Sequence, residues 1–174
     1  IRLKQFDREI AMLVENGDKP GADRKTVEKE EFRLKEIRAQ VERYPNDLQI
    51  KFSCGEALLA VGQYDEAIRL FQNSQGLPKV RVRSLLDLAI CFKEKGQADI
   101  AIEQLLKAES EVPNMNEMRK EILYLLATLL EQSGRLSEAV ARFKEIYQAD
   151  INFKDVAEKI NRSYKSNTTK NAPA

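Results

Sequence analysis

The sequence contains no histidine and no tryptophan among its 174 residues. The lack of histidine excludes His-dependent catalytic triads, HExxH zinc sites and most general acid–base schemes. The seven glycines are dispersed, so no glycine-rich phosphate-binding loop is present, and no CxxC pair exists that could hold zinc. We therefore expect a protein that is not an enzyme, with no catalytic residues, no metal and no cofactor.

The chain also lacks an excess of either charge and any long apolar run. Lys and Arg number 29 and Asp and Glu number 28, a formal net charge of +1 with the two signs interspersed. A nucleic-acid-binding protein would show a one-sided basic surface, so we expect no nucleic-acid partner. No apolar run reaches the length of a membrane span. Hydrophobic residues at 43% and charged residues at 33% are typical of a helix-rich chain.

Only two cysteines are present, Cys54 and Cys91, which are too few for a disulfide framework. Both fall in predicted helices, where a free cysteine behaves as a small buried thiol. The chain opens at Ile1 rather than Met, so we expect that the true N-terminus was processed or cut away. The absence of a signal peptide therefore carries little weight, and the compartment stays open, with the cytoplasm favoured.

What the sequence does contain is a motif that recurs at a nearly fixed interval. The string Gly62–Ile68 returns as Gly96–Ile102 and again as Gly134–Val140, at intervals of 34 and 38 residues. A period near 34 residues indicates helix–turn–helix units that stack on copies of themselves. The longer second interval places its four extra residues at Pro113–Asn116 or at the start of the next helix.

Small residues keep the same intervals in both helices of each unit. Two helices approach closely only where a side chain is small, and a large apolar residue one turn away fills the space beside that contact. The small residues are Gly55, Ala89 and Ala127 in the first helices and Ala67, Ala101 and Ala139 in the second helices, with Phe71, Leu105 and Phe143 beside the latter.

Glycines are expected to end the first helix of each unit with positive φ, because glycine adopts that conformation without strain. Polar residues three positions later are expected to cap the second helix. The glycines are Gly62, Gly96 and Gly134, and the expected caps are Asp65, Asp99 and Ser137.

This pattern resembles the tetratricopeptide repeat family. The resemblance rests on the small residues of both helices, the Gly-x-Tyr-x-x-Ala string at 62–67 and the proline after the second helix, and it covers about residues 48–147 in three units. It implies an all-α fold, an α-solenoid of antiparallel helix pairs that forms a right-handed superhelix. The Trp often found early in the first helix is missing from every unit. These marks are packing residues, so they indicate the fold and leave the function open.

The flanking segments differ from the repeats. Residues 1–46 are expected to form an N-terminal helical hairpin, with helices over 1–15 and 25–44 that each carry one narrow apolar stripe. A hairpin that covers the open end of the stack is favoured. The spacing also fits heptads, so a coiled-coil-like segment that self-associates through residues 1–44 is the alternative. Residues 47–164 are expected to hold the three repeats and a C-terminal capping helix over 150–160, and residues 165–174 a disordered tail.

In a stack of this type the first helices line a concave groove, on the face opposite their small packing residues. We expect this groove to bind a protein or peptide partner. Packing between neighbouring first helices, or under the N-terminal hairpin, is the alternative role of its apolar residues. The predicted groove residues are Gln49, Phe52, Ser53, Glu56, Arg83, Leu86, Asp87, Ile90, Lys93, Glu121, Tyr124, Leu125 and Thr128.

One use of the family's groove can be tested by residue. Co-chaperone members of the family hold the acidic C-terminus of heat-shock chaperones with Lys, Asn and Arg side chains. The matching positions here are acidic or apolar and none is basic, so a carboxylate ligand would be repelled. A helical or extended segment with apolar anchors and some basic residues suits the groove better. These positions are Phe52, Glu56, Asp87, Glu121 and Leu125.

The sequence therefore predicts a non-catalytic protein–protein interaction module, an adaptor that binds a partner segment in the concave groove. Two alternatives stay open. The chain could be a structural scaffold in which the N-terminal helices self-associate, or the regulatory region of a larger protein. The identity of the partner and the biological process do not follow from the sequence.

Overall fold

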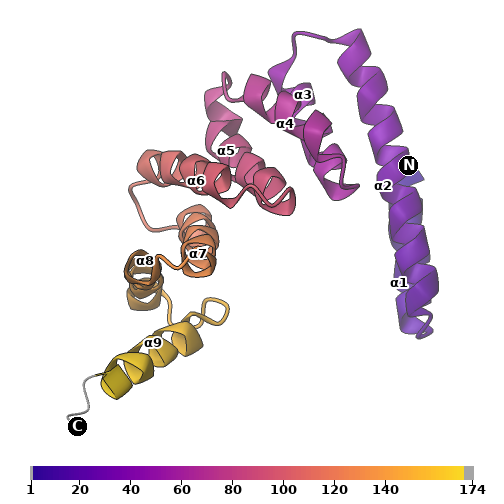
Figure 1. Ribbon diagram of the computed structural model, residues 1–174. Helices are drawn as coiled ribbons and strands as arrows, with labels where there is room; N and C mark the ends of the chain where they lie inside the picture. Colours follow the sequence, from indigo (N-terminus) through magenta and orange to yellow (C-terminus); the bar gives the residue numbers. More distant parts are fainter. Residues whose placement is uncertain (1, 171–174) are drawn as a thin grey trace. The chain divides into compact units, whose positions relative to one another are not determined.

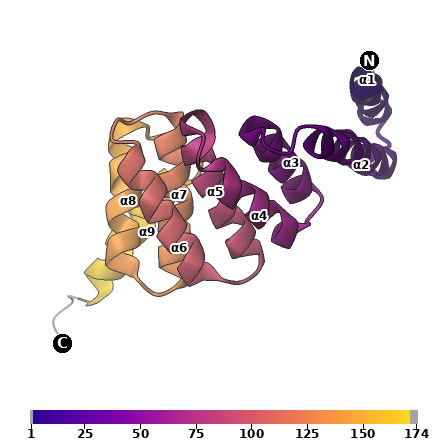
Figure 2. The ribbon, with the colours of Figure 1, turned by 90° about the horizontal axis from the view of Figure 1, so that it is seen from above.

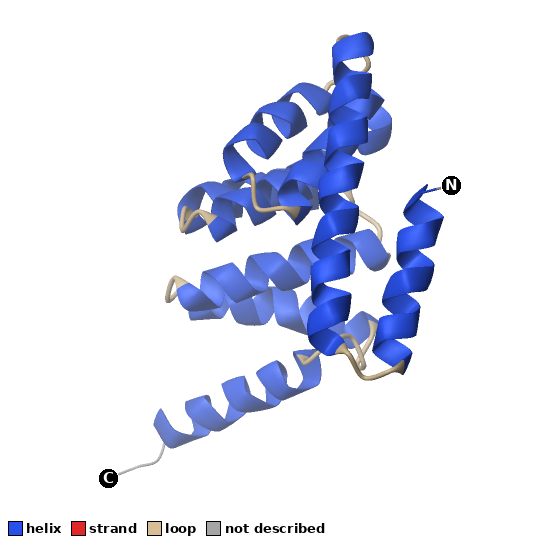
Figure 3. Ribbon diagram, turned by 90° about the vertical axis from the view of Figure 1, so that its right-hand side faces the viewer, coloured by secondary structure: helices blue, strands red, loops and turns tan. Residues whose placement is uncertain are grey.

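The computed structural model describes residues 2–170, and the side chains of residues 2–164. Figure 3 shows only helices and connecting loops in this part of the chain, which confirms the predicted all-α class. Each helix is joined to the next by a short connection. The helices are α1 (Arg2–Glu15), α2 (Lys19–Arg43), α3 (Leu48–Ala60), α4 (Tyr64–Ser74), α5 (Pro78–Glu94), α6 (Ala98–Glu111), α7 (Glu117–Gln132), α8 (Leu136–Ala149) and α9 (Val156–Lys170).

The chain divides into two compact units, and the division falls inside α5. The first unit ends at Cys91 and the second begins at Phe92. In the first unit, α1 packs on α2, α2 on α3 and α3 on α4 (Figure 1). In the second unit, α6 packs on α7, α7 on α8 and α8 on α9 (Figure 2). The domain division predicted between residues 46 and 47 lies inside the first unit and stays a prediction.

The predicted glycine turns are confirmed, and the same turn also joins α1 to α2. Gly62 has φ of 75°. Its N–H donates to the Leu59 carbonyl at 3.1 Å, and the Gln63 N–H donates to the Leu58 carbonyl at 2.9 Å, which is the Schellman arrangement. Gly17, with φ of 73°, makes the equivalent pair of bonds. The N-terminal hairpin therefore reverses direction in the same way as the repeats.

The predicted caps of the second helices are wrong. The glycine turn leads directly into the next helix, so α4, α6 and α8 begin one residue before the predicted cap. The residues at the N-cap positions make no side-chain capping bond. The predicted caps lie in the first helical turn, where a carboxylate still interacts favourably with the helix dipole. These residues are Asp65, Asp99 and Ser137.

The helix α2 begins six residues earlier than the predicted range 25–44. Asp18 is its N-cap, and its Oδ1 accepts a hydrogen bond from the Gly21 N–H at 2.9 Å. Pro20 fits the first turn because its missing N–H would have no partner there. The sequence indicated a loop through Gly21, but the aspartate and the proline start the helix instead.

The last helix begins at Val156, not at Asp150 as predicted. The Asp150 Oδ1 accepts a hydrogen bond from the Asn152 N–H at 3.1 Å, and Lys154 has a positive φ of 48°, so residues 150–155 form turns. The helix continues to Lys170 and includes the first part of the predicted tail. Residues 171–174 lie outside the described residues, and a disordered tail over 165–174 stays a prediction.

The small-residue columns lie in the core as predicted. Ala67 is fully buried, and a Cβ placed on Gly55 would lie 2.7 Å from Cε1 of Phe71. Real Cβ atoms do not approach so closely, so the absent side chain of Gly55 makes room for the Phe71 ring. The four extra residues of the second interval arise only in part where predicted, because the connection before α7 has five residues, 112–116, and the one before α5 has three, 75–77. They arise mainly because α6 has 14 residues and α4 has 11.

We expect Gly55→Ala to lower the free energy of unfolding by about 1–2 kcal/mol, because the new Cβ overlaps the Phe71 ring. This is the net change, because the cost of the overlap should exceed the gain in helix propensity from glycine to alanine, which is about 1 kcal/mol. Adding Phe71→Leu, which reproduces the Ala89 and Leu105 of the second repeat, should restore part of the loss. Denaturant unfolding in a double-mutant cycle measures the coupling.

The exposed substitution Gln72→Ala on α4 is the control and should leave the free energy of unfolding within about 0.5 kcal/mol of the wild type. A Gly55→Ala variant as stable as the wild type would show that the helices of the first repeat can separate without loss.

Candidate functional site

The predicted groove residues lie on α3, α5 and α7. On α3, Gln49, Ser53 and Glu56 follow one another at helical spacing and form a row with access to solvent, Gln49 being exposed. Phe52 lies beside this row but is only 6% exposed, and its ring centroid is 5.8 Å from that of Phe71 on α4. Phe52 therefore packs inside the first repeat, against the second helix of its own hairpin, which is neither the groove nor a contact between neighbouring first helices.

On α5, two of the predicted residues are buried. Leu86 is 3% exposed and Asp87 is 1% exposed. The Nε atom of Arg83 lies 3.1 Å from Oδ1 of Asp87, one helical turn away. Ile90 and Lys93 are half-buried. Because Asp87 is buried, only Glu56 and Glu121 of the predicted acidic border keep access to solvent.

On α7, Tyr124 contacts the connection between α8 and α9. Its hydroxyl donates a hydrogen bond to Oδ1 of Asp155 at 2.6 Å, and Nζ of Lys154 lies 4.3 Å from its ring centroid. Its ring also meets the edges of Phe143 and Phe153, at centroid distances of 5.9 and 6.0 Å. Burial, together with the hydrogen bond to Asp155, raises the pKa of Tyr124 to about 12.

Other residues on the same side of α7 extend this contact. Nζ of Lys120 lies 2.7 Å from Oδ2 of Asp150 and 5.0 Å from the ring centroid of Phe153. The hydrogen bond to Lys120 lowers the pKa of the Asp150 carboxyl, and the bonds to Asp150 and then Glu117 raise the pKa of Lys120. Glu131 forms an ion pair with Lys159 of α9. Sequence reasoning missed this contact, because partners 28 to 31 positions apart follow no helical period.

The remaining predicted residues of α7 form a separate row. Glu121, Leu125 and Thr128 follow one another at the spacing seen on α3, and all three keep access to solvent. They occupy the positions in the third repeat that Gln49, Ser53 and Glu56 occupy in the first. The two rows lie in different units, so the structure does not bring them into one site.

Both cysteines lie in the interior of the structure. Cys54 is 2% exposed and Cys91 is fully buried, and burial raises the pKa of both thiols, that of Cys91 to about 12. A thiol with such a pKa is neutral near pH 7 and a poor nucleophile. Within the described part of the chain, no group of three or more Cys, Asp or Glu side chains is placed to hold a metal ion.

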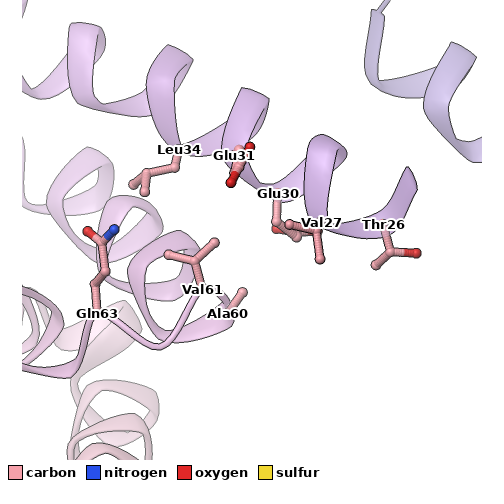
Figure 4. A pocket seen from close by; sticks show the side chains of 8 residues that line it. All are labelled: Thr26, Val27, Glu30, Glu31, Leu34, Ala60, Val61 and Gln63. Carbon is pink, nitrogen blue, oxygen red and sulfur yellow. The ribbon is translucent and has the colours of Figure 1, made fainter. Parts of the chain in front are cut away.

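A cavity of about 380 Å³ opens between α2 and the turn that joins α3 to α4 (Figure 4). We call it the α2 notch. Its interior is apolar, and carboxylates of α2 lie at its edge. Sequence reasoning did not find it, although the apolar Val27 on an otherwise polar stretch of α2 was a signal. The lining residues are Thr26, Val27, Glu30, Glu31, Leu34, Ala60, Val61 and Gln63.

The family model described as "Tetratrico peptide repeat" matches residues 48–154. The chain belongs to the tetratricopeptide repeat family, as the sequence pattern indicated. Among the helices that the structure describes, none has the length and apolar content needed to cross a membrane. The match begins at Leu48, so the α1–α2 hairpin precedes it.

Solved structures share this fold. A crystal structure of MamA has a TM-score of 0.66 at 15% identity and covers 90% of this chain and 83% of its own. MamA from MSR-1 has a TM-score of 0.59 at 18% identity, with coverage of 93% and 91%. A putative kinesin light chain with TPR-like repeats from Podosopora anserina has 0.58 at 18%, with coverage of 97% and 87%. No curated protein matches the chain. Such identities support the fold alone.

We expect Tyr124→Phe to remove the contact to Asp155 and to lower the free energy of unfolding by about 0.5–1.5 kcal/mol. Because the pKa of Tyr124 is raised from 10.0 to about 12 by folding, the neutral phenol stabilises the native state. This stabilisation is present below pH 10 and is lost as the pH rises through about 12.

Ultraviolet titration of the phenols checks this expectation. The difference between the titration curves of the wild type and Tyr124→Phe should show one phenol with a midpoint near pH 12. A difference curve centred near pH 10 would contradict the buried, hydrogen-bonded state of Tyr124.

Proposed function

We propose that this chain is a non-catalytic interaction module that binds a segment of a partner protein at an exposed row of a first helix, on α3 in the first unit or on α7 in the second. The observation that carries the proposal is the pair of matching rows, Gln49–Ser53–Glu56 on α3 and Glu121–Leu125–Thr128 on α7. Each row keeps solvent access on a helix of which about half of the other residues are buried. Membership of a repeat family that generally mediates protein–protein interaction supports the same function.

The chemistry of the rows favours a partner segment with basic and small apolar residues. Glu56 and Glu121 place carboxylates in both rows, and neither row contains a basic residue. The apolar contribution is smaller than the sequence indicated, because Phe52 and Leu86 are buried and Tyr124 contacts the α8–α9 connection. Leu125 is then the main apolar anchor of the α7 row. We expect modest affinity, because a few anchors must offset the free energy lost on association.

Selection of displayed peptides on the full chain, followed by titration of the selected peptides, tests the proposal. The selected peptides should be enriched in Lys or Arg beside apolar residues. Leu125→Glu should weaken their binding at least about tenfold, because it places a charge at the apolar anchor. Leu106→Glu on α6 is the matched control, since Leu106 is 38% exposed and lies outside the predicted groove.

Both variants should keep the helical circular dichroism of the wild type. Equal loss of binding in the two leucine variants, or selection of acidic peptides, would reject binding along these rows. A second pair gives an independent check: Glu56→Lys should weaken the binding of basic peptides, whereas Glu103→Lys on the exposed surface of α6 should not.

A further inference from the structure

The helix α2 is much longer than the helix on which it packs. It has 25 residues and α3 has 13, so α2 is roughly 18 Å longer at 1.5 Å per residue. Its N-terminal half projects past the end of α3, as Figure 1 shows. On one face of that half lies α1, tied by the ion pairs of Glu9 with Lys25 and of Asp7 with Lys29. The other face of this half lines the α2 notch, opposite the turn that joins α3 to α4.

The α2 notch combines an apolar interior with an acidic edge. Leu34 forms a buried part of its wall, whereas Val27 is 57% exposed (Figure 4). Glu30 pairs with Arg33, with 3.5 Å between the charged atoms. Glu31 is exposed and forms no ion pair within residues 2–164. The volume of about 380 Å³ is many times the roughly 30 Å³ that a water molecule occupies, so it can hold large side chains.

The outer face of α1 carries the complementary chemistry. Phe6 is 5% exposed and marks the face toward α2. On the opposite face Met12 is 62% exposed, and Arg8 lies one helical turn before it. Lys4 lies one turn before Arg8, and neither cation forms an ion pair in the described part of the chain. The exposed, flexible side chain of Met12 therefore has two cations on its N-terminal side, and Glu15 lies one turn after it.

We propose that α1 of one copy docks into the α2 notch of a second copy. In this contact Met12 enters the apolar interior beside Val27 and Val61, and Arg8 faces Glu31. The unbranched methionine side chain adapts to an irregular apolar space. The opposite charges orient the two chains, and the apolar contact supplies most of the affinity. This contact uses neither of the exposed rows and does not depend on partner binding there.

The two surfaces lie on opposite sides of α2, so the contact is head-to-tail. Each copy presents one outer α1 face and one α2 notch. Figure 3 shows α1 beside α2. A contact of this type does not close on itself in a dimer and extends to further copies or to a ring. A single helix in a notch makes a small interface, so we expect weak, concentration-dependent association.

Sedimentation velocity on the full chain, from about 10 µM to about 1 mM, tests the proposal in the range of weak interfaces. The average mass should rise above the 19.9 kDa of one copy as the concentration increases. Met12→Asp and Val27→Asp should each lower the association constant at least about tenfold. Val14→Asp is the matched control, because Val14 is also 62% exposed but lies on another side of α1.

The head-to-tail arrangement predicts the outcome of mixing. Met12→Asp keeps an intact notch and Val27→Asp keeps an intact α1 face, so an equimolar mixture should form a one-to-one dimer and stop there. Arg8→Glu and Glu31→Arg should each weaken association about fivefold, and the two substitutions in one chain should restore it to within about twofold.

Circular dichroism and thermal unfolding verify that each variant is folded. A chain that stays monomeric up to the highest concentration overturns the proposal and assigns the notch to a different partner. Association that Val14→Asp weakens as much as Met12→Asp, or that the charge exchange fails to restore, also overturns it.

Discussion

The close contact between the two helices of a hairpin, α3 with α4 and α7 with α8, is the constraint on which the rest of each unit depends. Ala67, Ala101 and Ala139 are buried, and in the first repeat the Phe71 ring fills the space that Gly55 leaves empty. Helices that meet at such small residues bury their large neighbours on both sides of the contact. The exposed rows of α3 and α7 follow from this contact, because the residues opposite a buried stripe must face outward.

The repeat architecture could be predicted from the sequence because the packing residues recur at intervals of 34 and 38 residues. The glycine turns at Gly62 and its equivalents were predictable for the same reason, since positive φ selects glycine. The start of α2 was harder to predict, because Asp18 and Pro20 favour a helix start whereas Gly21 favours a turn. Local chemistry favoured both a loop and a helix there, and only the structure decides between them.

The candidate site was less predictable than the fold. Helical geometry placed Phe52 and Tyr124 on the groove side of their helices, but it did not show what would cover them. Phe52 packs on Phe71 within its own hairpin, and Tyr124 binds Asp155 from a connection 31 positions away. Contacts between distant segments carry no periodic signal, so a face opposite the small residues is an upper bound on the surface that a partner can reach.

The glycine turn between α1 and α2 sets the length of the α1–α2 hairpin, which we call the N-terminal arm. A Schellman turn reverses the chain within a few residues, so Gly17 and the Asp18 cap that follows it together decide where α2 starts. The contacts of α2 with α3 lie near its other end and are unaffected by that start. Shifting the glycine by one heptad would lengthen or shorten the arm by roughly 10 Å and leave the repeats untouched. The reach of this molecule is thus adjustable independently of its scaffold.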